Sequence, residues 1–166
     1  MATRPQERTL NEHVLALLRG GNAHMGLSEA VASFPADAYN VRPPNVTYTP
    51  WHLLEHIRRT QKDILNFIQN PHYSEPKWPD DFWPKAEEQA DERAWNQTIE
   101  GIREDLVALE GIVTNDQVDL LSDLPYEPGY TYLRELLLVA DHSAYHIGEF
   151  AILRQVMGTW PKDRRA

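Results

Sequence analysis

The sequence predicts an all-α protein, folded as a single four-helix bundle domain over residues 1–166. Four stretches place apolar residues at the three- and four-residue spacing of one helix face. No segment shows a convincing two-residue alternation, which is typical of strands. The chain has 166 residues, of which 42% are hydrophobic. This length supports one hydrophobic core but does not require two.

The first helix is predicted from about Leu10 to Phe34. Its core face carries Leu10, Val14, Leu17, Gly21, His24 and Val31. Gly20, Gly21 and Gly26 weaken this helix, because a glycine costs roughly 1 kcal/mol relative to alanine in an exposed helix interior. We expect the helix to bend there, or another segment to pack closely against it.

The second helix is predicted to begin after Thr49, a suitable N-cap, with Pro50 at its first position. It continues to about Gln69. A long crossover follows at residues 70–85, where Pro71, Pro76, Pro79 and Pro84 exclude regular structure. Its aromatic residues are Tyr73, Trp78, Phe82 and Trp83. They are too apolar for a free linker, so we expect an ordered loop, either a lid or, as we favour, a plug on the outside of the core.

The third helix is predicted from about Asp91 to Val113. Its apolar residues, spaced by three and four, are Trp95, Ile99, Ile102, Leu106, Leu109 and Val113. Thr131 can cap a fourth helix that continues to about Met157 and stops before Gly158. The fourth helix is apolar on two sides, which indicates deep burial.

Two histidines, His142 and His146, continue one apolar stripe of the fourth helix. The other members of this stripe are Leu138, Val139, Phe150, Leu153 and Met157. A buried imidazole needs a hydrogen-bond partner or a bound ligand. Two histidines four residues apart on one helix face can also bind a single metal ion. The pair therefore indicates either a metal site or two structural histidines.

A third metal ligand is expected from the second helix. His56 lies nearer the centre of its apolar stripe than His52, so His56 is favoured and His52 is expected to be exposed in the first turn. A competing pattern, H-x-x-E-H from His52 to His56, matches the inverted zinc-peptidase signature. In that minor alternative both histidines bind zinc and the glutamate activates water, but His142 and His146 stay unexplained.

Three stretches of the chain together resemble a known family. TPWHLLEHI, WPDDFWP and LRELLLVADHSAYHIGEFAILRQVMG are similar to segments of the DinB-like proteins, which include bacillithiol- and mycothiol-dependent transferases and isomerases. The resemblance spans nearly the whole chain. It implies helices in up-down-down-up order and a divalent ion, often nickel or zinc, held by one histidine of the second helix and two of the last. By motif these are His56, His142 and His146, which the helical phase also selects.

Two further residues are candidates for lining the pocket. His24 lies on the inward face of the first helix, where it could line the pocket, bind a ligand or be a satisfied core residue. Glu149 stands where many family members have glutamine. It could accept a hydrogen bond beside the metal, although we favour a charge at the rim of the bundle.

Three histidines on a divalent ion leave at least one coordination position open. Two enzyme hypotheses follow: a hydrolase that uses metal-bound hydroxide, and a transferase that activates the sulfur of a low-molecular-weight thiol. The chain has no cysteine of its own. The non-enzymatic alternative is a metal- or ligand-binding protein of a stress response. Zinc or nickel is favoured, and manganese or iron also suits histidine and water ligands.

Composition limits the partners. The formal net charge of -9 argues against nucleic acid and anionic membranes, which bind clustered lysine and arginine. The N-terminal stretch MATRPQERTL lacks the hydrophobic segment of a signal peptide, and no apolar run approaches about 18 residues. We therefore expect a cytoplasmic protein that acts on a small-molecule substrate. A homodimer formed through an apolar stripe of the fourth helix is a further expectation.

Overall fold

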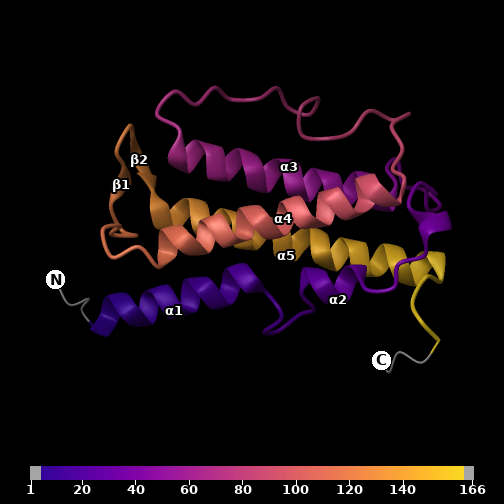
Figure 1. The fold of residues 1–166 in the computed structure, drawn as a ribbon, viewed down its shortest axis with the longest axis horizontal. Helices are drawn as coiled ribbons and strands as arrows, with labels where there is room; N and C mark the ends of the chain where they lie inside the picture. Colours follow the sequence, from indigo (N-terminus) through magenta and orange to yellow (C-terminus); the bar gives the residue numbers. More distant parts are fainter. Residues whose placement is uncertain (1–4, 163–166) are drawn as a thin grey trace.

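Four long helices make up most of the protein in the computed structural model, which describes residues 5–162 (Figure 1). They are α1 (Pro5–Arg19), α3 (Pro50–Gln69), α4 (Glu92–Val113) and α5 (Tyr132–Met157). A short helix, α2 (Leu27–Val31), and the 3-10 turn η1 (Ala36–Ala38) lie between α1 and α3, and the strands β1 (Asp123–Leu124) and β2 (Glu127–Thr131) precede α5. Within the described residues, no helix combines the length and the hydropathy needed to cross a membrane.

Side-chain caps begin three of the long helices where the sequence predicted. Thr49, Asp91 and Thr131 each accept a hydrogen bond from the backbone N–H three residues later. Such a bond satisfies one of the N–H groups that a helix start leaves unpaired. At the other end of α5, Gly158 adopts a φ of 64°, the left-handed conformation that commonly ends a helix. The predicted bounds of α3, α4 and α5 are therefore confirmed to within a residue.

The first helical segment differs from the prediction of one helix from about Leu10 to Phe34. α1 ends at Arg19, and the chain turns away at Gly20 and Gly21, whose φ angles are 67° and 76°. Glycine adopts this left-handed region without the steric penalty of a Cβ atom. Two successive residues with positive φ cannot continue a right-handed helix. The predicted bend is therefore a complete break, and helix resumes only in α2.

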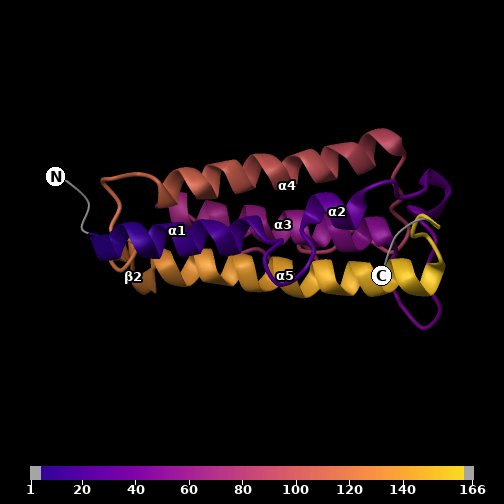
Figure 2. The same ribbon diagram turned by 90° about the horizontal axis from the view of Figure 1, so that it is seen from below.

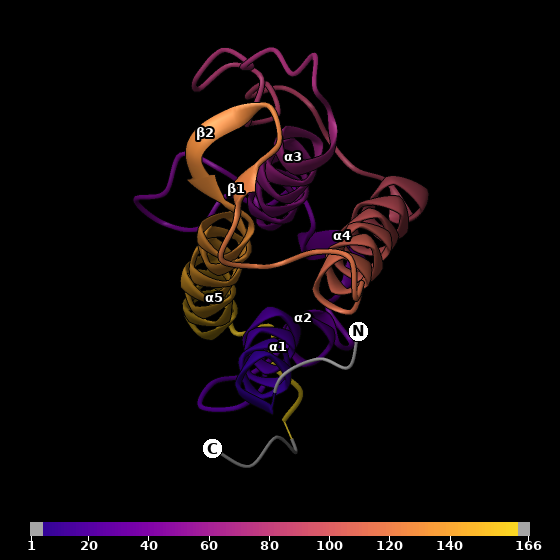
Figure 3. The ribbon, with the colours of Figure 1, turned by 90° about the vertical axis from the view of Figure 1, so that its left-hand side faces the viewer.

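The long helices pack around a common centre, as an end-on view makes plain (Figure 3). α3 contacts α4 and α5, while α1 contacts the same two helices from the opposite side. α1 and α5 run in one direction, and α3 and α4 run in the other (Figure 1, Figure 2). The two middle helices are therefore parallel, which requires the long connection at residues 70–91.

The core consists of two clusters of buried side chains along the helix axes. The cluster near α2 contains an aromatic stack in which the rings of Tyr39 and Trp95 lie 4.0 Å apart at 6°. The cluster near the hairpin is built from aliphatic residues such as Val14, Leu109 and Leu136. His56 and His146 lie beside the cluster near α2, because the residues that follow them, Ile57 and Ile147, are members of it.

A buried arginine joins α2 to α5. Arg154 has no exposed surface, and its Nη1 atom donates hydrogen bonds to the carbonyl oxygens of Ala30 at 2.6 Å and Ala32 at 2.8 Å. These carbonyls belong to the end of α2, where a helix leaves its last C=O groups unpaired. Arg154 therefore holds the short helix against α5 despite the break after α1.

The hairpin departs from the all-α prediction. β1 and β2 pair antiparallel, with Asp123 opposite Thr131 and Leu124 opposite Glu127. Leu124 is buried, whereas β2 is exposed along most of its length. Strands of two and five residues are too short to display a two-residue alternation. The sequence shows no strand signal here for that reason.

Candidate metal centre

His56 lies in the second turn of α3 with only 2% of its surface exposed. Its ring stacks on that of Trp83, with the centroids 4.0 Å apart and the planes at 7°. Its Nδ1 atom donates a hydrogen bond to the carbonyl oxygen of Phe82 at 3.0 Å. Stacking and hydrogen bond together fix the plane of the imidazole and direct its Nε2 atom towards α5.

His142 and His146 project from one face of α5, because residues four apart on a helix point the same way. The Nε2 atom of His142 lies 3.1 Å from Nε2 of His56. The Nε2 atom of His146 lies 3.2 Å from the same nitrogen. The predicted convergence of the three histidines from two helices is therefore confirmed.

Two of the three rings have their tautomer fixed by the partner of the other nitrogen. Nδ1 of His56 faces a carbonyl oxygen, and Nδ1 of His146 lies 2.6 Å from the carboxylate oxygen Oε2 of Glu149. Both partners can only accept, so both Nδ1 atoms carry a proton and each ring turns its Nε2 atom towards the other. These two Nε2 atoms lie 3.2 Å apart. A proton or a metal cation can bridge them at this distance.

Two of the three nitrogen separations suit a shared divalent cation. Histidine nitrogen binds such ions at about 2.1 Å, so two ligand nitrogens lie roughly 3.0 Å apart at a right angle and roughly 3.4 Å apart at a tetrahedral angle. The observed separations of 3.1 and 3.2 Å fall between these values. All three ligand atoms lie within 4.8 Å of one another. A proton can bridge only one pair, so the convergence of three nitrogens favours a metal ion.

Two of the candidate ligands are held in the neutral form that metal binding requires. Burial and, to a lesser extent, the nearby His146 lower the pKa of His56 to about 4, although the hydrogen bond to Phe82 raises it. Burial also lowers the pKa of His142 to about 3, with contributions from the other two histidines. At neutral pH neither ring must lose a proton before it can bind a cation.

Glu149 supports His146 from behind, and Tyr48 supports Glu149. The carboxylate accepts the hydrogen bond of His146 through Oε2 and that of the Tyr48 hydroxyl through Oε1. Burial alone raises the pKa of Glu149, but these two hydrogen bonds and the nearby histidines together outweigh it and leave the pKa below its usual value. Glu149 is therefore an ionised partner of a candidate ligand. It is not the unpartnered charge that the sequence favours at the rim of the bundle.

Replacing Glu149 by alanine is expected to weaken divalent-metal binding about 10- to 100-fold, the usual cost of losing a partner that orients a ligand histidine. Glu149→Gln keeps an oxygen acceptor and should lose less. Tyr48→Phe, which removes only the outer hydrogen bond, should lose least. Competition with a chromophoric chelator measures each affinity. Glu104→Ala, an exposed glutamate on α4, is the matched control, and an unchanged affinity in Glu149→Ala would refute the supporting role.

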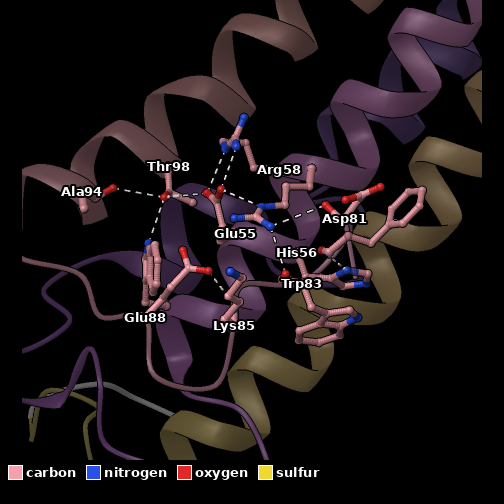
Figure 4. A network of polar contacts seen from close by, with 12 residues as sticks. Glu55, His56, Arg58, Asp81, Trp83, Lys85, Glu88, Ala94 and Thr98 are labelled. Carbon is pink, nitrogen blue, oxygen red and sulfur yellow. Dashed lines mark hydrogen bonds and ion pairs between the residues drawn. The ribbon is translucent and has the colours of Figure 1, made fainter. Parts of the chain in front are cut away.

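The crossover loop is held over His56 by hydrogen bonds from α3 (Figure 4). Nη1 of Arg59 donates to the carbonyl oxygen of Trp83 at 2.9 Å, beside the bond from His56 to Phe82. Trp83 packs against the core, as a plug does, whereas Trp78 is 70% exposed. The sequence identified the aromatic residues of this loop but could not assign its backbone carbonyls to His56 and Arg59.

The inverted peptidase pattern is not realised. Glu55 accepts hydrogen bonds from Arg58 at 2.8 and 2.7 Å, from Arg59 at 3.0 Å and from the hydroxyl of Thr98 at 3.0 Å (Figure 4). Burial raises the pKa of Glu55, but these hydrogen bonds lower it below its usual value overall. The carboxylate is fully engaged in a buried ion-pair network, so it is not placed as a base for water beside His56.

The expectation that His52 is exposed is wrong. Only 2% of its surface is accessible, and its Nε2 atom lies 2.8 Å from the carbonyl oxygen of Glu88. The end of the crossover loop covers the first turn of α3, which a helical projection of α3 alone could not reveal. With Nε2 occupied by a carbonyl, His52 does not join the cluster of His56.

His24 lies apart from the three histidines. The expected inward face of the first helix does not extend to it, because α1 ends at Arg19. Its side chain is exposed, and Nδ1 lies 2.8 Å from the carbonyl oxygen of Met25. His24 does line a cavity, but this cavity is bounded by Ala140 and Ala144 of α5 and does not include the histidine cluster.

The fold and the site define a class, namely helical proteins in which three convergent histidines form a cluster compatible with binding a divalent metal. A model of the DinB family matches residues 21–163, a range that contains all three histidines. The chain therefore belongs to the DinB family, as the resemblance of its motifs predicted. Searches of the curated proteins and of the solved structures found no match.

Proposed function

We propose that this protein is a metal-dependent enzyme acting on a small molecule, either an S-transferase for a low-molecular-weight thiol or a hydrolase. In this proposal the helices form an up-down-down-up four-helix bundle, and His56, His142 and His146 hold one divalent ion, zinc or nickel, through their Nε2 atoms. The observation that supports it most directly is the approach of the Nε2 atoms of His142 and His146 to 3.1 and 3.2 Å from Nε2 of His56.

An open coordination position favours catalysis over a purely structural ion. The group of residues able to hold an ion comprises three histidines and no carboxylate within the described part of the chain. Glu149 faces the Nδ1 side of His146 and is not a fourth ligand. Structural zinc sites are usually closed by four protein ligands. When bound, the ion supplies Lewis-acid chemistry, which lowers the pKa of a coordinated water or thiol.

The residues around the histidines complete the proposed site. Glu149 keeps the proton of His146 on Nδ1 and so keeps Nε2 available. Trp83 covers one face of His56 and excludes water from it. The chain has no cysteine, so the sulfur nucleophile of a transfer reaction would come from a free thiol. This favours neither the transferase nor the hydrolase, since hydroxide needs no protein nucleophile either.

The test is a comparison of metal-loaded protein with the His142→Ala variant. Zinc- and nickel-loaded samples are incubated with glutathione, bacillithiol or mycothiol and the electrophile 1-chloro-2,4-dinitrobenzene, and conjugates are measured by mass spectrometry. Parallel samples receive nitrophenyl esters to detect hydrolysis. We expect turnover in one assay that disappears in His142→Ala. Stoichiometric metal without turnover in either assay would favour the alternative of a non-catalytic metal- or ligand-binding protein.

A further inference from the structure

A cavity of about 170 Å³ lies where the first helical segment breaks between α1 and α2. Its floor is formed by Ile57 of α3, Ile102 of α4 and Ile147 of α5, all buried. These residues belong to the core cluster near α2, whereas Leu18, which also lines the cavity, belongs to the cluster near the hairpin. The cavity therefore borders both core clusters, beside the break between α1 and α2.

This cavity is distinct from the histidine cluster. On α5 it is lined by Ala140, Ser143, Ala144 and Ile147, which share one face. His142 lies two residues from both alanines, which corresponds to about 200° around the helix. The body of α5 consequently lies between the cavity and the candidate metal ligands.

Two arginines lie at the mouth of the cavity. Its lining includes Arg19 and Arg103, both exposed, and the exposed His24, but no aspartate or glutamate; Glu110, which pairs with Arg19, is outside the lining. The chain as a whole has 25 acidic and 16 basic residues. In a chain with this excess of acidic residues, a cavity lined by arginines and by no carboxylate favours an anionic ligand.

Arg103 is the cation best placed to bind such a group. Its contacts are long: Nη1 lies 3.8 Å from Glu100 and Nη2 lies 3.4 Å from the hydroxyl of Ser28. A guanidinium has five N–H donors, so these contacts leave donors for a ligand. Arg19, in contrast, is held by Glu110 through two bonds of 2.9 and 2.7 Å.

A polar group also reaches the floor. Gln61 is 96% buried, since only 4% of its surface is accessible, and it lines the cavity. Its amide nitrogen donates to the carbonyl oxygen of Ile102 at 2.7 Å. The amide oxygen then offers an acceptor among apolar side chains, the usual way in which a pocket orients a small ligand.

We propose that this cavity is a binding site for a small aromatic carboxylate. An apolar cavity of about 150 Å³ accommodates benzene, so a single six-membered ring matches the volume between the two core clusters. The ligand's ring fills the apolar floor, and its carboxylate pairs with Arg103 at the mouth. This site does not depend on the proposed enzyme activity, because the histidines are on another face of α5.

The test uses the full chain loaded with zinc and titrated calorimetrically with phenylacetate. We expect phenylacetate to bind at least about 10-fold tighter than 2-phenylethylamine, which has a similar shape and the opposite charge. Arg103→Gln should weaken phenylacetate binding about 5-fold, within the range of a partly exposed ion pair. Arg93→Gln, an exposed arginine on the same helix, should leave it unchanged.

Filling the cavity provides a second test. Ala144→Leu places additional atoms in the apolar space and should abolish binding while the zinc content stays at one ion per chain. The thermal midpoint of unfolding reports whether this variant folds. If Ala144→Leu does not fold, the effect of Arg103→Gln and the comparison of phenylacetate with 2-phenylethylamine decide whether the site exists. Equal binding of the acid and the amine, or no binding of phenylacetate at millimolar concentration, would overturn the proposal.

Discussion

Replacing His56 or His142 by alanine is expected to remove stoichiometric binding of zinc or nickel. Their Nε2 atoms lie 3.1 Å apart and, with His146, form the one cluster proposed to hold the ion. Removing the hydrogen-bond partner that orients a ligand histidine weakens metal affinity about 10- to 100-fold. Removing the ligand itself should therefore weaken it more than about 100-fold. After equilibration and desalting, mass spectrometry should find about one ion per wild-type chain and less than about 0.1 per variant chain.

The controls separate loss of a ligand from loss of the fold. His24→Ala removes an exposed histidine outside the cluster and should keep the metal. His56→Gln retains a side chain that can donate to the carbonyl of Phe82 and should also lose the ion. Circular dichroism confirms the helical content of each variant. Retention of one ion by folded His56→Ala and His142→Ala would remove the basis of the proposed function.

Metal-free protein is expected to lose about 2 kcal/mol of stability between pH 7.5 and pH 5.5. Burial depresses the pKa of His56 to about 4 and that of His142 to about 3 in the folded state, against about 6.5 in the unfolded chain. In this pH range the unfolded state binds protons that the folded state rejects. Stability is therefore fully present above pH 6.5 and falls as the pH decreases, by up to about 1.4 kcal/mol per pH unit for each group.

Denaturant unfolding followed by circular dichroism at several pH values measures this loss. The helical signal is preferable to tryptophan fluorescence, because Trp83 stacks on His56 and its emission responds to the charge of that ring. His142→Leu removes one titrating group from the same position and should reduce the loss by about half, since the groups contribute similarly. A wild-type stability that stays constant over this range would show that the histidines are not desolvated.

The local sequence was sufficient for the parts of the fold that depend on neighbouring residues. Thr49, Asp91 and Thr131 cap helices whose apolar residues recur every three or four positions, and both signals lie within one helix. The choice of His56, His142 and His146 depended on the same periodicity, because helical phase determines which side chains face the interior. The motif resemblance gave the family, which the match over residues 21–163 confirms.

Contacts between residues far apart in the sequence determine the features of the fold and the site that the sequence did not predict. The burial of His52 depends on the carbonyl of Glu88, 36 residues away, and the support of Glu149 depends on Tyr48, 101 residues away. The break after Arg19 was only partly visible in the sequence, because glycines permit a positive φ without requiring it.

The sequence by itself determined which segments are helical in α3, α4 and α5 and that His56, His142 and His146 share the inward faces of two helices, because both follow from the 3.6-residue period of one helix. Only the tertiary structure decided that the three Nε2 atoms lie close together, that a loop carbonyl and a carboxylate fix the tautomers of His56 and His146, and that a cavity borders both core clusters. These features require side chains from different elements to approach within a few ångströms. The relative placement of helices sets such distances, and no periodicity along a single helix encodes it.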